Sequence, residues 1–241
     1  IHYDYLVIAL GSETNFFGLK NVEKYSFTMK TLADAISLRN RLIDMLEQAE
    51  NEKNPKIKER LLTFVIVGGG FAGVETAGEI NDFLHEAVSY YHNTKKEDIH
   101  VILVEAASTI LQGFNKRLTE YAHNKLEKNG IKIVLENAVT SFDGKNIILN
   151  KLSKPSVGID SKNIINSHTL VWTAGVTPVE IIQNSIFKIK KGKIIVNEFL
   201  EIPNYPGVFA IGDCSQFDDE VNNKFPPTAQ LAEAHAKLVA Y

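Results

Sequence analysis

The sequence contains a single cysteine among its 241 residues, Cys214, and this scarcity removes several kinds of chemistry. One thiol cannot form a disulfide within the chain or the dithiol pair of a redox enzyme, and it argues against a cysteine-rich metal site. We therefore interpret Cys214 as a small packing residue. None of the seven histidines has a metal-like neighbour at a suitable spacing. The sequence predicts no resident metal ion.

Long apolar runs and a strong charge bias are also missing. No apolar stretch approaches the roughly 18 residues that a membrane-spanning helix needs, and no signal peptide opens the chain. The net charge is −3 and no long basic run occurs, which argues against nucleic acid as a partner. The densest cationic segment, residues 188–193, lies between strand-like runs and predicts a solvated hairpin turn. The length suggests one or two domains with a sizeable core.

The most informative segment is a glycine pattern between an expected strand and an expected helix. Residues 63–79 read TFVIVGGGFAGVETAGE and contain the GxGxxG spacing of dinucleotide-binding loops. The first glycine of this spacing allows a tight turn, the second lets the backbone approach a pyrophosphate, and the third lets helix and strand pack closely. The helix start offers free N–H groups to the phosphates. The expected contact residues are Gly68, Gly69, Gly70, Phe71, Ala72 and Gly73.

A carboxylate follows the next expected strand. Residues 99–104 read IHVILV, and Glu105 comes directly after them. A carboxylate in this place binds both hydroxyls of an adenosine ribose and repels a 2′-phosphate, so it favours NAD over NADP. The separation from Gly68 is 105 − 68 = 37 residues, whereas the simple unit has about 20. We expect the excess in a lengthened helix and loop. The alternative is a glycine-rich turn that only packs, with Glu105 facing solvent.

Strand-like and helical runs alternate along the rest of the chain, which is typical of an α/β fold with a mainly parallel sheet. The pattern predicts a buried strand over residues 3–10, a helix over 32–50 with Thr31 as its N-cap, a polar linker over 51–60 and a helix over 118–128. It also predicts a hairpin around residues 143–145 and strands over 169–173 and 207–211. Because the chain starts within a strand and stops within a helical pattern, we expect it to be a segment of a longer protein.

Several segments together resemble, in order, the type II NADH:quinone oxidoreductases, which belong to the two-dinucleotide-binding-domain flavoproteins. They are YDYLVIALGSETNFFG, FVIVGGGFAGVETAGEI, VILVEA, LVWTAGV, GVFAIGDCS and PPTAQLAEAHA. The resemblance implies a Rossmann-like NADH-binding domain with a central parallel sheet at residues 57–175. This domain is inserted into a second, FAD-type Rossmann-like domain, formed by residues 1–56 and 176–241. The family's N-terminal FAD fingerprint and its membrane-associating region have no counterpart in this sequence, which leaves open whether the segment alone retains FAD or activity.

The resemblance also implies roles for single residues. Glu75 would face the nicotinamide carboxamide and the flavin edge, and Gln230 would lie near the isoalloxazine on the quinone side. These two are the expected catalytic residues. The other expected cofactor contacts are Ala174 and Gly175 for the nicotinamide half, and Ala9, Gly11, Thr14, Gly212, Asp213 and Ala229 for FAD. The structural alternatives are a helix-dipole carboxylate at Glu75, an N-cap at Asp213 and plain strand-end turns at the glycines.

The implied function is the transfer of electrons from NADH through FAD to a quinone. The implied setting is a peripheral protein, with a homodimer as its assembly, on the cytoplasmic face of the cell membrane. Two alternatives stay open at this point. One is an NADH-dependent reductase of a small iron–sulfur or rubredoxin-type carrier, which would share every nucleotide motif. The other is a non-catalytic nucleotide-binding module that keeps the NAD fold.

Overall fold

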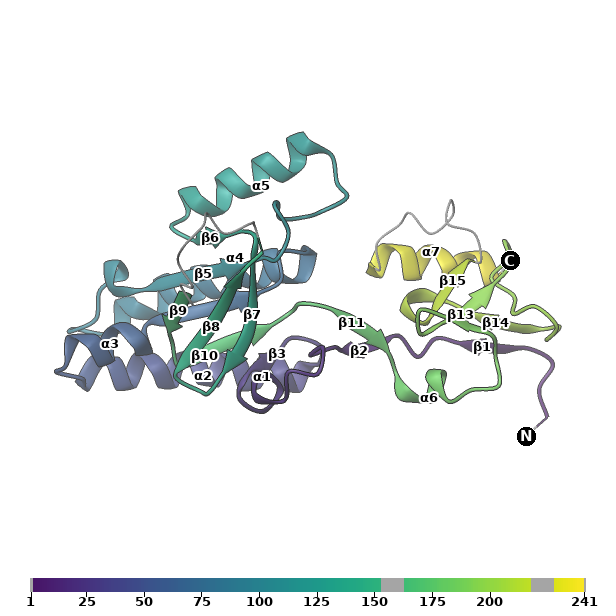
Figure 1. Cartoon of the computed structure of the whole chain (residues 1–241), viewed down its shortest axis with the longest axis horizontal. Helices are drawn as coiled ribbons and strands as arrows, with labels where there is room; N and C mark the ends of the chain where they lie inside the picture. The colour runs from purple at the N-terminus through teal and green to yellow at the C-terminus, as the bar shows by residue number, and fades with distance from the viewer. Residues whose placement is uncertain (1, 153–162, 218–227, 241) are drawn as a thin grey trace. The chain divides into compact units, whose positions relative to one another are not determined.

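The computed structural model describes residues 2–152, 163–217 and 228–240, which form two compact units. The inserted unit comprises Asn15–Gly175, and the flanking unit combines Ile1–Thr14 with Val176–Tyr241. Figure 1 shows helices and strands alternating along the chain. The expected fold class is confirmed, since an α/β unit with a central parallel sheet is inserted into a second α/β unit.

The inserted unit is built on a five-stranded sheet in which every neighbouring pair is parallel. The strand order is β3 (Phe27–Thr28), β10 (Thr169–Trp172), β4 (Thr63–Val67), β5 (His100–Val104) and β6 (Lys132–Val134). Its helices are α1 (Lys20–Tyr25), α2 (Leu32–Asn51), α3 (Pro55–Leu61), α4 (Phe71–Ala87) and α5 (Lys116–Lys128), with 3-10 turns at Val88–Tyr90 and Lys96–Asp98. In a parallel sheet all carboxyl ends lie at one edge, so the ends of β4, β5 and β10 are neighbours.

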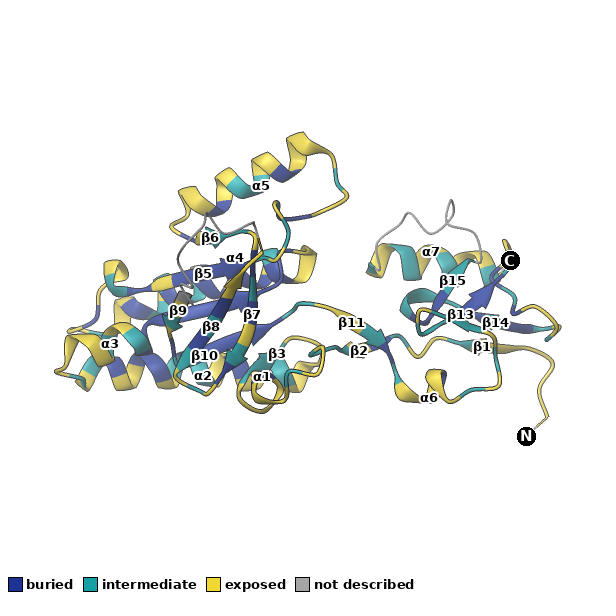
Figure 2. Ribbon diagram, viewed as in Figure 1, coloured by how far each residue is buried: buried dark blue, intermediate teal, exposed yellow. Residues whose placement is uncertain are grey.

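A second sheet covers one face of the first. It is antiparallel and contains β7 (Asn137–Phe142), β8 (Asn146–Lys151) and β9 (Asn163–Asn166). The side chains of β4 alternate between two cores: Val65 packs with residues of β7 and β8, while Phe64 packs with residues of α2 and α4. Both faces of the parallel sheet are therefore buried, which explains the nearly continuous apolar runs of its strands. Figure 2 shows these central strands as mostly buried.

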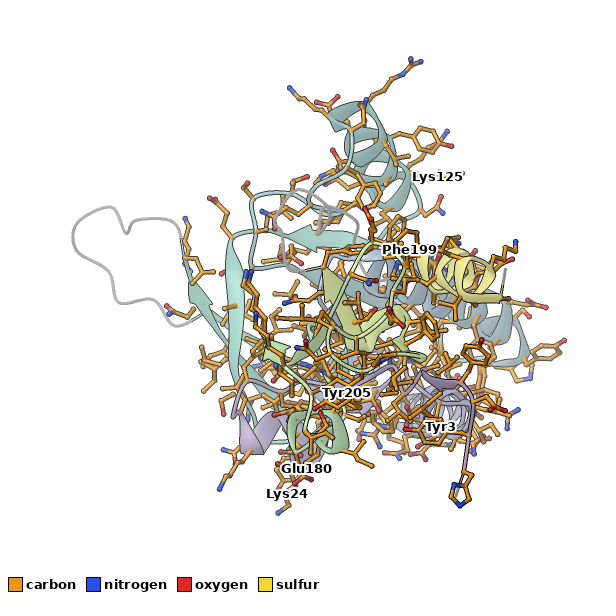
Figure 3. The ribbon with its side chains drawn as sticks, turned by 90° about the vertical axis from the view of Figure 1, so that its right-hand side faces the viewer. Tyr3, Lys24, Lys125, Glu180, Phe199 and Tyr205 are labelled. Atoms are coloured by element: carbon orange, nitrogen blue, oxygen red, sulfur yellow. The ribbon has the colours of Figure 1, made fainter. Side chains whose placement is uncertain are left out.

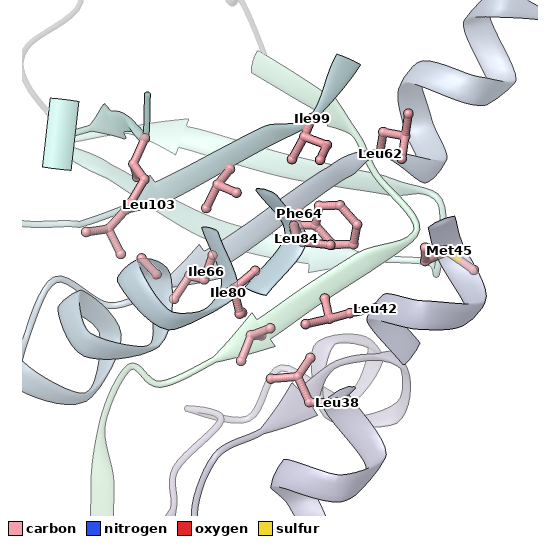
Figure 4. Packing of buried hydrophobic residues seen from close by; sticks show 14 of the residues in the cluster. Leu38, Leu42, Met45, Leu62, Phe64, Ile66, Ile80, Leu84, Ile99 and Leu103 are labelled. Atoms are coloured by element: carbon pink, nitrogen blue, oxygen red, sulfur yellow. The ribbon is translucent and has the colours of Figure 1, made fainter. Parts of the chain in front are cut away.

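The core on the helical face depends strongly on α2. This helix begins with the expected N-cap, because the Thr31 hydroxyl accepts from the Asp34 N–H at 3.1 Å and the Asp34 carboxylate accepts from the Thr31 N–H at 2.9 Å. Figure 4 shows Leu38 and Leu42 of α2 packed in the same cluster as Phe64 of β4. Charged side chains such as Lys24 and Lys125 project from the outer helices (Figure 3).

Two expectations about the first 60 residues differ from the structure. The polar stretch expected to be a linker contains α3, whose first residue is Pro55 and whose N-cap Asn54 accepts from the Lys56 N–H at 3.0 Å. The compact inserted unit starts at Asn15 and not at the expected boundary of residue 57. The physical reason is that β3 adds a strand to the parallel sheet and α2 buries its apolar side against it. The assignment of the two units to NADH and FAD stays a proposal.

In its described residues the flanking unit contains short strands and two helices. A parallel pair joins β1 (Leu6–Ile8) and β14 (Val208–Ala210), and an antiparallel pair joins β2 (Ser12–Thr14) and β11 (Val176–Pro178). A three-stranded sheet contains β12 (Ile189–Lys190), β13 (Lys193–Val196) and β15 (Ser215–Phe217), with the expected hairpin between β12 and β13. The helices are α6 (Glu180–Gln183) and α7 (Ala229–Ala240), and a 3-10 turn covers Gly212–Cys214.

The first strand differs from its prediction. The sequence suggested a buried strand over residues 3–10, but only Leu6–Ile8 forms β1, and Leu6 and Val7 are exposed. Within the described residues β1 pairs only with β14, so one of its edges and much of its surface face solvent. No described helix combines the length and the apolar character that crossing a membrane requires.

Replacing Leu46 by Ala tests the place of α2 in the core of the inserted unit. Leu46 is fully buried, so we expect Leu46→Ala to lower the free energy of unfolding by about 2–5 kcal/mol. Leu32 lies on the same helix but is 77% exposed. The control Leu32→Ala should therefore change the free energy of unfolding by no more than about 0.5 kcal/mol. Denaturant unfolding measures both, and equal small effects would show that α2 is not part of this core.

Candidate functional site

The glycine turn after β4 is held by contacts that leave no space for side chains. Gly68 has a φ of +109°, and its N–H donates to the Val104 carbonyl at 2.8 Å. A Cβ added at Gly73 would lie 1.7 Å from the Gly68 carbonyl oxygen and 2.8 Å from the Thr173 hydroxyl. A Cβ at Gly68 would lie 2.9 Å from the Ala174 backbone. These contacts bring the ends of β4 and β10 and the start of α4 together.

The outer side of the same turn is open. Gly70 is the N-cap of α4 and is exposed, and a Cβ added there would meet no atom within 4 Å. Phe71 and Ala72 follow it and are exposed as well. The first N–H groups of a helix have no acceptor within the helix, and they carry the positive end of its dipole. The site therefore combines a tight inner side with an outer side that an anionic group can approach, which fits a bound pyrophosphate.

Glu105 lies directly beside this turn. It follows β5, is half-buried, and its Oε2 accepts a hydrogen bond from the Gly69 N–H. Its Oε1 accepts from the Ala107 N–H at 2.7 Å. Two backbone donors thus fix the carboxylate at the carboxyl edge of the sheet. Because an ionised carboxylate offers about four acceptor positions, it can still accept hydrogen bonds from two ribose hydroxyls.

The end of β10 is covered on one side by an aromatic ring. Gly175 has a φ of +83°, and a Cβ added there would lie 2.4 Å from the Phe17 ring. The Gly175 carbonyl accepts from the Asn15 N–H at 3.2 Å, and the Trp172 indole donates to the Asn15 carbonyl at 2.9 Å. The segment after β2 is therefore anchored to the end of β10. Trp172 is buried in the core that the parallel sheet shares with β7 and β8.

Glu75 lies on α4, one turn after its start, and its side chain is exposed. The glycine turn packs against the residues that follow two neighbouring strands. Gly69 contacts Glu105 after β5, and Gly68 lies against Ala174 after β10. The structure therefore brings together the residues expected to bind the dinucleotide, and it places Glu75 on solvent-facing surface of the same helix. Its expected role toward nicotinamide and flavin stays a prediction.

In the flanking unit, a hydrogen bond joins the two segments expected to contact FAD. The Ser12 hydroxyl donates to Asp213 Oδ2 at 2.6 Å. Gly11 and Gly212, which directly precede these two residues, have φ values of +66° and +68°. A Cβ added at Gly11 would meet no atom within 4 Å. The chain therefore turns sharply at both positions and leaves open space at Gly11, a backbone surface that a cofactor can approach.

The segments on either side of this hydrogen bond are paired as well. The Ile211 N–H donates to the Ile8 carbonyl at 3.0 Å, which brings Ala9 and the Gly212 turn to the ends of the paired strands β1 and β14. Thr14 lies at the end of β2, where it pairs with Val176. These contacts fix the positions of the expected FAD residues that precede α7.

Helix α7 places Ala232 and His235 against the Gly212 turn. The Thr228 hydroxyl, directly before α7, accepts from the Leu231 N–H at 3.2 Å and so caps the start of the helix. Ala229 and Gln230 are exposed in the first turn. His235 lies farther along, and its Nδ1 accepts from the Gly212 N–H at 3.2 Å. Burial lowers the pKa of His235, which favours the neutral ring that this bond requires.

Cys214 is fully buried, and its thiol donates to the Ile211 carbonyl at 3.2 Å. This geometry agrees with a packing role for the thiol. In the described part of the chain, His, Cys, Asp and Glu side chains nowhere gather in a group of three that could hold a metal ion.

Sequence reasoning missed three residues that shape these sites. Ser12 holds Asp213, His235 holds the Gly212 turn, and Phe17 covers Gly175. Ser12 and Asp213 are 201 positions apart, so no local pattern could pair them. Phe17 lies in the segment NFFG, which gave a signal only as part of the family resemblance. Nothing in its local pattern indicated that its ring would cover Gly175.

The comparison with protein families agrees with this geometry. A model described as pyridine nucleotide-disulphide oxidoreductase matches residues 1–236. The chain belongs to this family. Since it contains one buried cysteine, the dithiol chemistry that the family name mentions has no pair of thiols within these residues.

Curated members of the family give a more specific likeness, and they confirm the resemblance to type II NADH:quinone oxidoreductases. The mitochondrial external alternative NADH-ubiquinone oxidoreductase of Yarrowia lipolytica is 34% identical over 100% of this chain and 41% of its own length. A probable NADH dehydrogenase of Dictyostelium discoideum is 34% identical over 99% of this chain and 51% of its own length. The chain thus spans about half or less of these relatives.

Solved structures of the family share the fold. NDH2 from Plasmodium falciparum in complex with NADH matches with a TM-score of 0.80 and 24% identity, over 90% of this chain and 45% of that one. The ferredoxin reductase of the CYP199A2 system from Rhodopseudomonas palustris matches with a TM-score of 0.72 and 22% identity, over 100% of this chain and 52% of that one. At these identities the likeness supports the arrangement of the strands and helices.

A pair of glycine substitutions on α4 tests the tight inner side of the turn. In Gly73→Ala the new methyl group meets the Gly68 carbonyl, so we expect the free energy of unfolding to fall by about 1–3 kcal/mol or more. Gly78 is on the same helix with nothing within 4 Å of an added Cβ, so Gly78→Ala should raise it by about 0.5–1 kcal/mol. Thermal and denaturant unfolding distinguish the two, and equal effects would contradict the close packing.

The pKa of His235 predicts a pH dependence of stability. Burial lowers this pKa below the ordinary 6.5, so the unfolded chain binds the proton more readily than the folded one. The stabilisation is therefore fully present above the ordinary value and is lost as the pH falls from it through the folded pKa. We expect His235→Gln to show a shallower loss of unfolding free energy below that value than the unaltered protein. Denaturant unfolding across this range measures the difference, and parallel pH profiles would contradict it.

Proposed function

We propose that the complete protein is a flavin-dependent NADH:quinone oxidoreductase, and that the inserted unit of this chain binds NADH. The observation that carries the proposal is the arrangement around the glycine turn, with the open helix start at Gly70 and the Glu105 carboxylate beside Gly69. This arrangement offers donors to a pyrophosphate and acceptors to a ribose in one place. The names of the relatives, which include NADH-ubiquinone oxidoreductases, support the same reaction.

The carboxylate of Glu105 sets the choice of nucleotide in this proposal. It binds the two hydroxyls of the adenosine ribose, and its negative charge repels a 2′-phosphate. Ala174 and Gly175, at the end of β10, provide backbone for the nicotinamide half on the side that Phe17 does not cover. Glu75 contributes an exposed carboxylate one turn into α4, near the nicotinamide carboxamide.

The flanking unit provides part of an FAD site in this proposal. Asp213 accepts a hydrogen bond from the ribityl chain, and the Ser12 hydroxyl fixes its orientation. Gly11 and Gly212 supply turns with positive φ, and the open space at Gly11 keeps its backbone accessible. Ala9, Thr14, Ala229 and Gln230 complete the surface, with Gln230 on the quinone side. When bound, FAD supplies the hydride and electron chemistry, and the residues of the chain supply position and electrostatics.

A reductase of a small iron–sulfur or rubredoxin-type carrier is the second candidate. Its supporting observation is the likeness of the fold to a ferredoxin reductase. The quinone enzyme is favoured because relatives named as ubiquinone oxidoreductases are 34% identical over the whole of this chain, whereas the ferredoxin reductase is 22% identical. A non-catalytic nucleotide-binding module has no supporting feature beyond the glycine turn itself.

The setting of the reaction belongs to the same proposal. We infer peripheral attachment to the cytoplasmic face of a membrane, with a homodimer as the assembly. The apolar nature of a quinone substrate supports a membrane setting. Several relatives are named as mitochondrial, so a mitochondrial membrane is the compartment to compare with the cell membrane. Fractionation of cells with and without a high-salt wash separates peripheral from integral attachment.

Replacing Glu105 tests the nucleotide site. Loss of a charged hydrogen-bond partner should weaken NADH binding by roughly tenfold or more in Glu105→Gln, and the preference for NADH over NADPH should shrink. The matched control is Glu120→Gln on α5, whose carboxylate is exposed and paired with Lys116 on the surface. Calorimetric titration of both nucleotides gives the dissociation constants. Equal affinity of the unaltered protein for NADH and NADPH would remove Glu105 from this role.

The acceptor test uses purified, flavin-loaded protein and follows the oxidation of NADH. Rapid turnover with a soluble ubiquinone analogue, together with slow turnover with ferredoxin or rubredoxin, supports the quinone enzyme. The opposite pattern identifies a carrier reductase. Binding of NADH with no turnover of either acceptor, and no flavin absorbance, would leave only the nucleotide-binding module.

A further inference from the structure

The inserted unit has a concave site at the edge of its sheet opposite the glycine turn. A cleft of about 640 Å³ lies at the amino ends of β4, β5 and β6, between α3 and β9. Its lining includes Thr63, which starts β4, whereas the glycine turn follows Val67 at the other end of the same strand. This volume lies within the usual range for small-molecule sites. The residues described above for the dinucleotide do not line it.

The cleft is rich in positive charge. Lys56 and Arg60 are four residues apart on α3, so they share one face of the helix, and Lys132 enters from the start of β6. Among the described lining residues the only carboxylate is Glu59, so three cations face one anion there. The whole chain has a net charge of −3. Among the described residues, none of the three cations forms an ion pair within 4 Å.

A second observation shows that positive charge gathers at this edge. His168, which precedes β10, is half-buried, and its pKa is lowered first by burial and then by the charges of Arg41, Lys145 and Arg60. These cations come from α2, from the turn between β7 and β8, and from α3. The Arg41 guanidinium donates to the His168 carbonyl at 2.7 Å, which fixes it there. Arg41 is paired with Asp44 at 3.6 Å, whereas Lys145 and Arg60 form no ion pair within 4 Å among the described residues. Like charges from separate segments repel one another when no anion lies between them.

We propose that this cleft binds a small anion that carries a phosphate group. Arg60 provides a planar guanidinium that can hold two phosphate oxygens at once, and Lys56 and Lys132 provide point charges on either side. Apolar side chains of β5 and β9, such as Ile102 and Ile164, line the rest of the cleft and offer a surface to an organic part of the ligand. The phosphate belongs either to a soluble ester or to a lipid headgroup.

The first experiment uses inorganic pyrophosphate as the probe. It is titrated at constant ionic strength into protein already saturated with NADH, so that the glycine turn is occupied. We expect saturable binding that weakens by about tenfold or more in Arg60→Gln and, independently, in Lys132→Gln. Arg39→Gln is the matched control, since Arg39 is exposed on α2 and bonds to Asn40, and it should bind like the unaltered protein. The affinity for NADH should be unchanged in all three variants.

An NMR titration of His168 gives a readout that does not depend on affinity. Bound pyrophosphate should raise the pKa of this ring, because it offsets the charge of Arg60, and the rise should be absent in Arg60→Gln. Pyrophosphate binding that survives unchanged in Arg60→Gln and Lys132→Gln would overturn the proposal. An equal loss in Arg39→Gln would overturn it too, because it would show a general charge effect and no defined site.

A second arm separates the two sources of phosphate. Vesicles of phosphatidylcholine, with and without phosphatidic acid, are sedimented with each variant. Retention that requires both phosphatidic acid and Arg60 identifies a lipid headgroup as the ligand. Pyrophosphate binding without vesicle binding identifies a soluble phosphate ester. Failure of both probes overturns the proposal, and it leaves the proposed NADH site unaffected because NADH binding is measured separately.

Discussion

The close approach of Gly73 to the Gly68 carbonyl is the contact on which the inserted unit depends. It lets α4 start directly above the end of β4, with Thr173 of the neighbouring strand end packed against both. A side chain at Gly73 would push the helix away from the sheet, and the free N–H groups of its first turn would no longer point at the same place. The turn is thus at once part of the core and the floor of the candidate binding site.

The two edges of the parallel sheet differ in charge, and this difference suits them to different ligands. At the carboxyl edge, a helix start supplies partial positive charge next to a carboxylate, which matches a molecule that carries both phosphates and sugar hydroxyls. At the amino edge, full positive charges from several segments meet with one carboxylate among them. One sheet therefore presents a mixed polar site and a cationic site at opposite ends of the same strands.

Local patterns in the sequence predicted the features that local contacts determine. The glycine spacing, the cap at Thr31 and the strand directly before Glu105 all depend on neighbouring residues, and the structure contains each of them. Helix α3 was missed because charged residues dominate it and Leu61 is its only buried side chain, so it lacks an apolar stripe. The contact between Ser12 and Asp213 was beyond prediction, since it depends on the folded path of the intervening residues.

The insertion of one unit between β2 and β11 also affects how the chain folds. The first and last residues of the inserted unit are hydrogen-bonded, because the Asn15 N–H donates to the Gly175 carbonyl. The folded unit therefore holds the adjoining strands β2 and β11 close together. If it were unfolded, pairing of β2 with β11 would have to close a loop of the same length, at an entropic cost on the order of 4–5 kcal/mol. Folding of the inserted unit therefore lowers the entropic cost of pairing β2 with β11, and destabilising the inserted unit also destabilises that pairing.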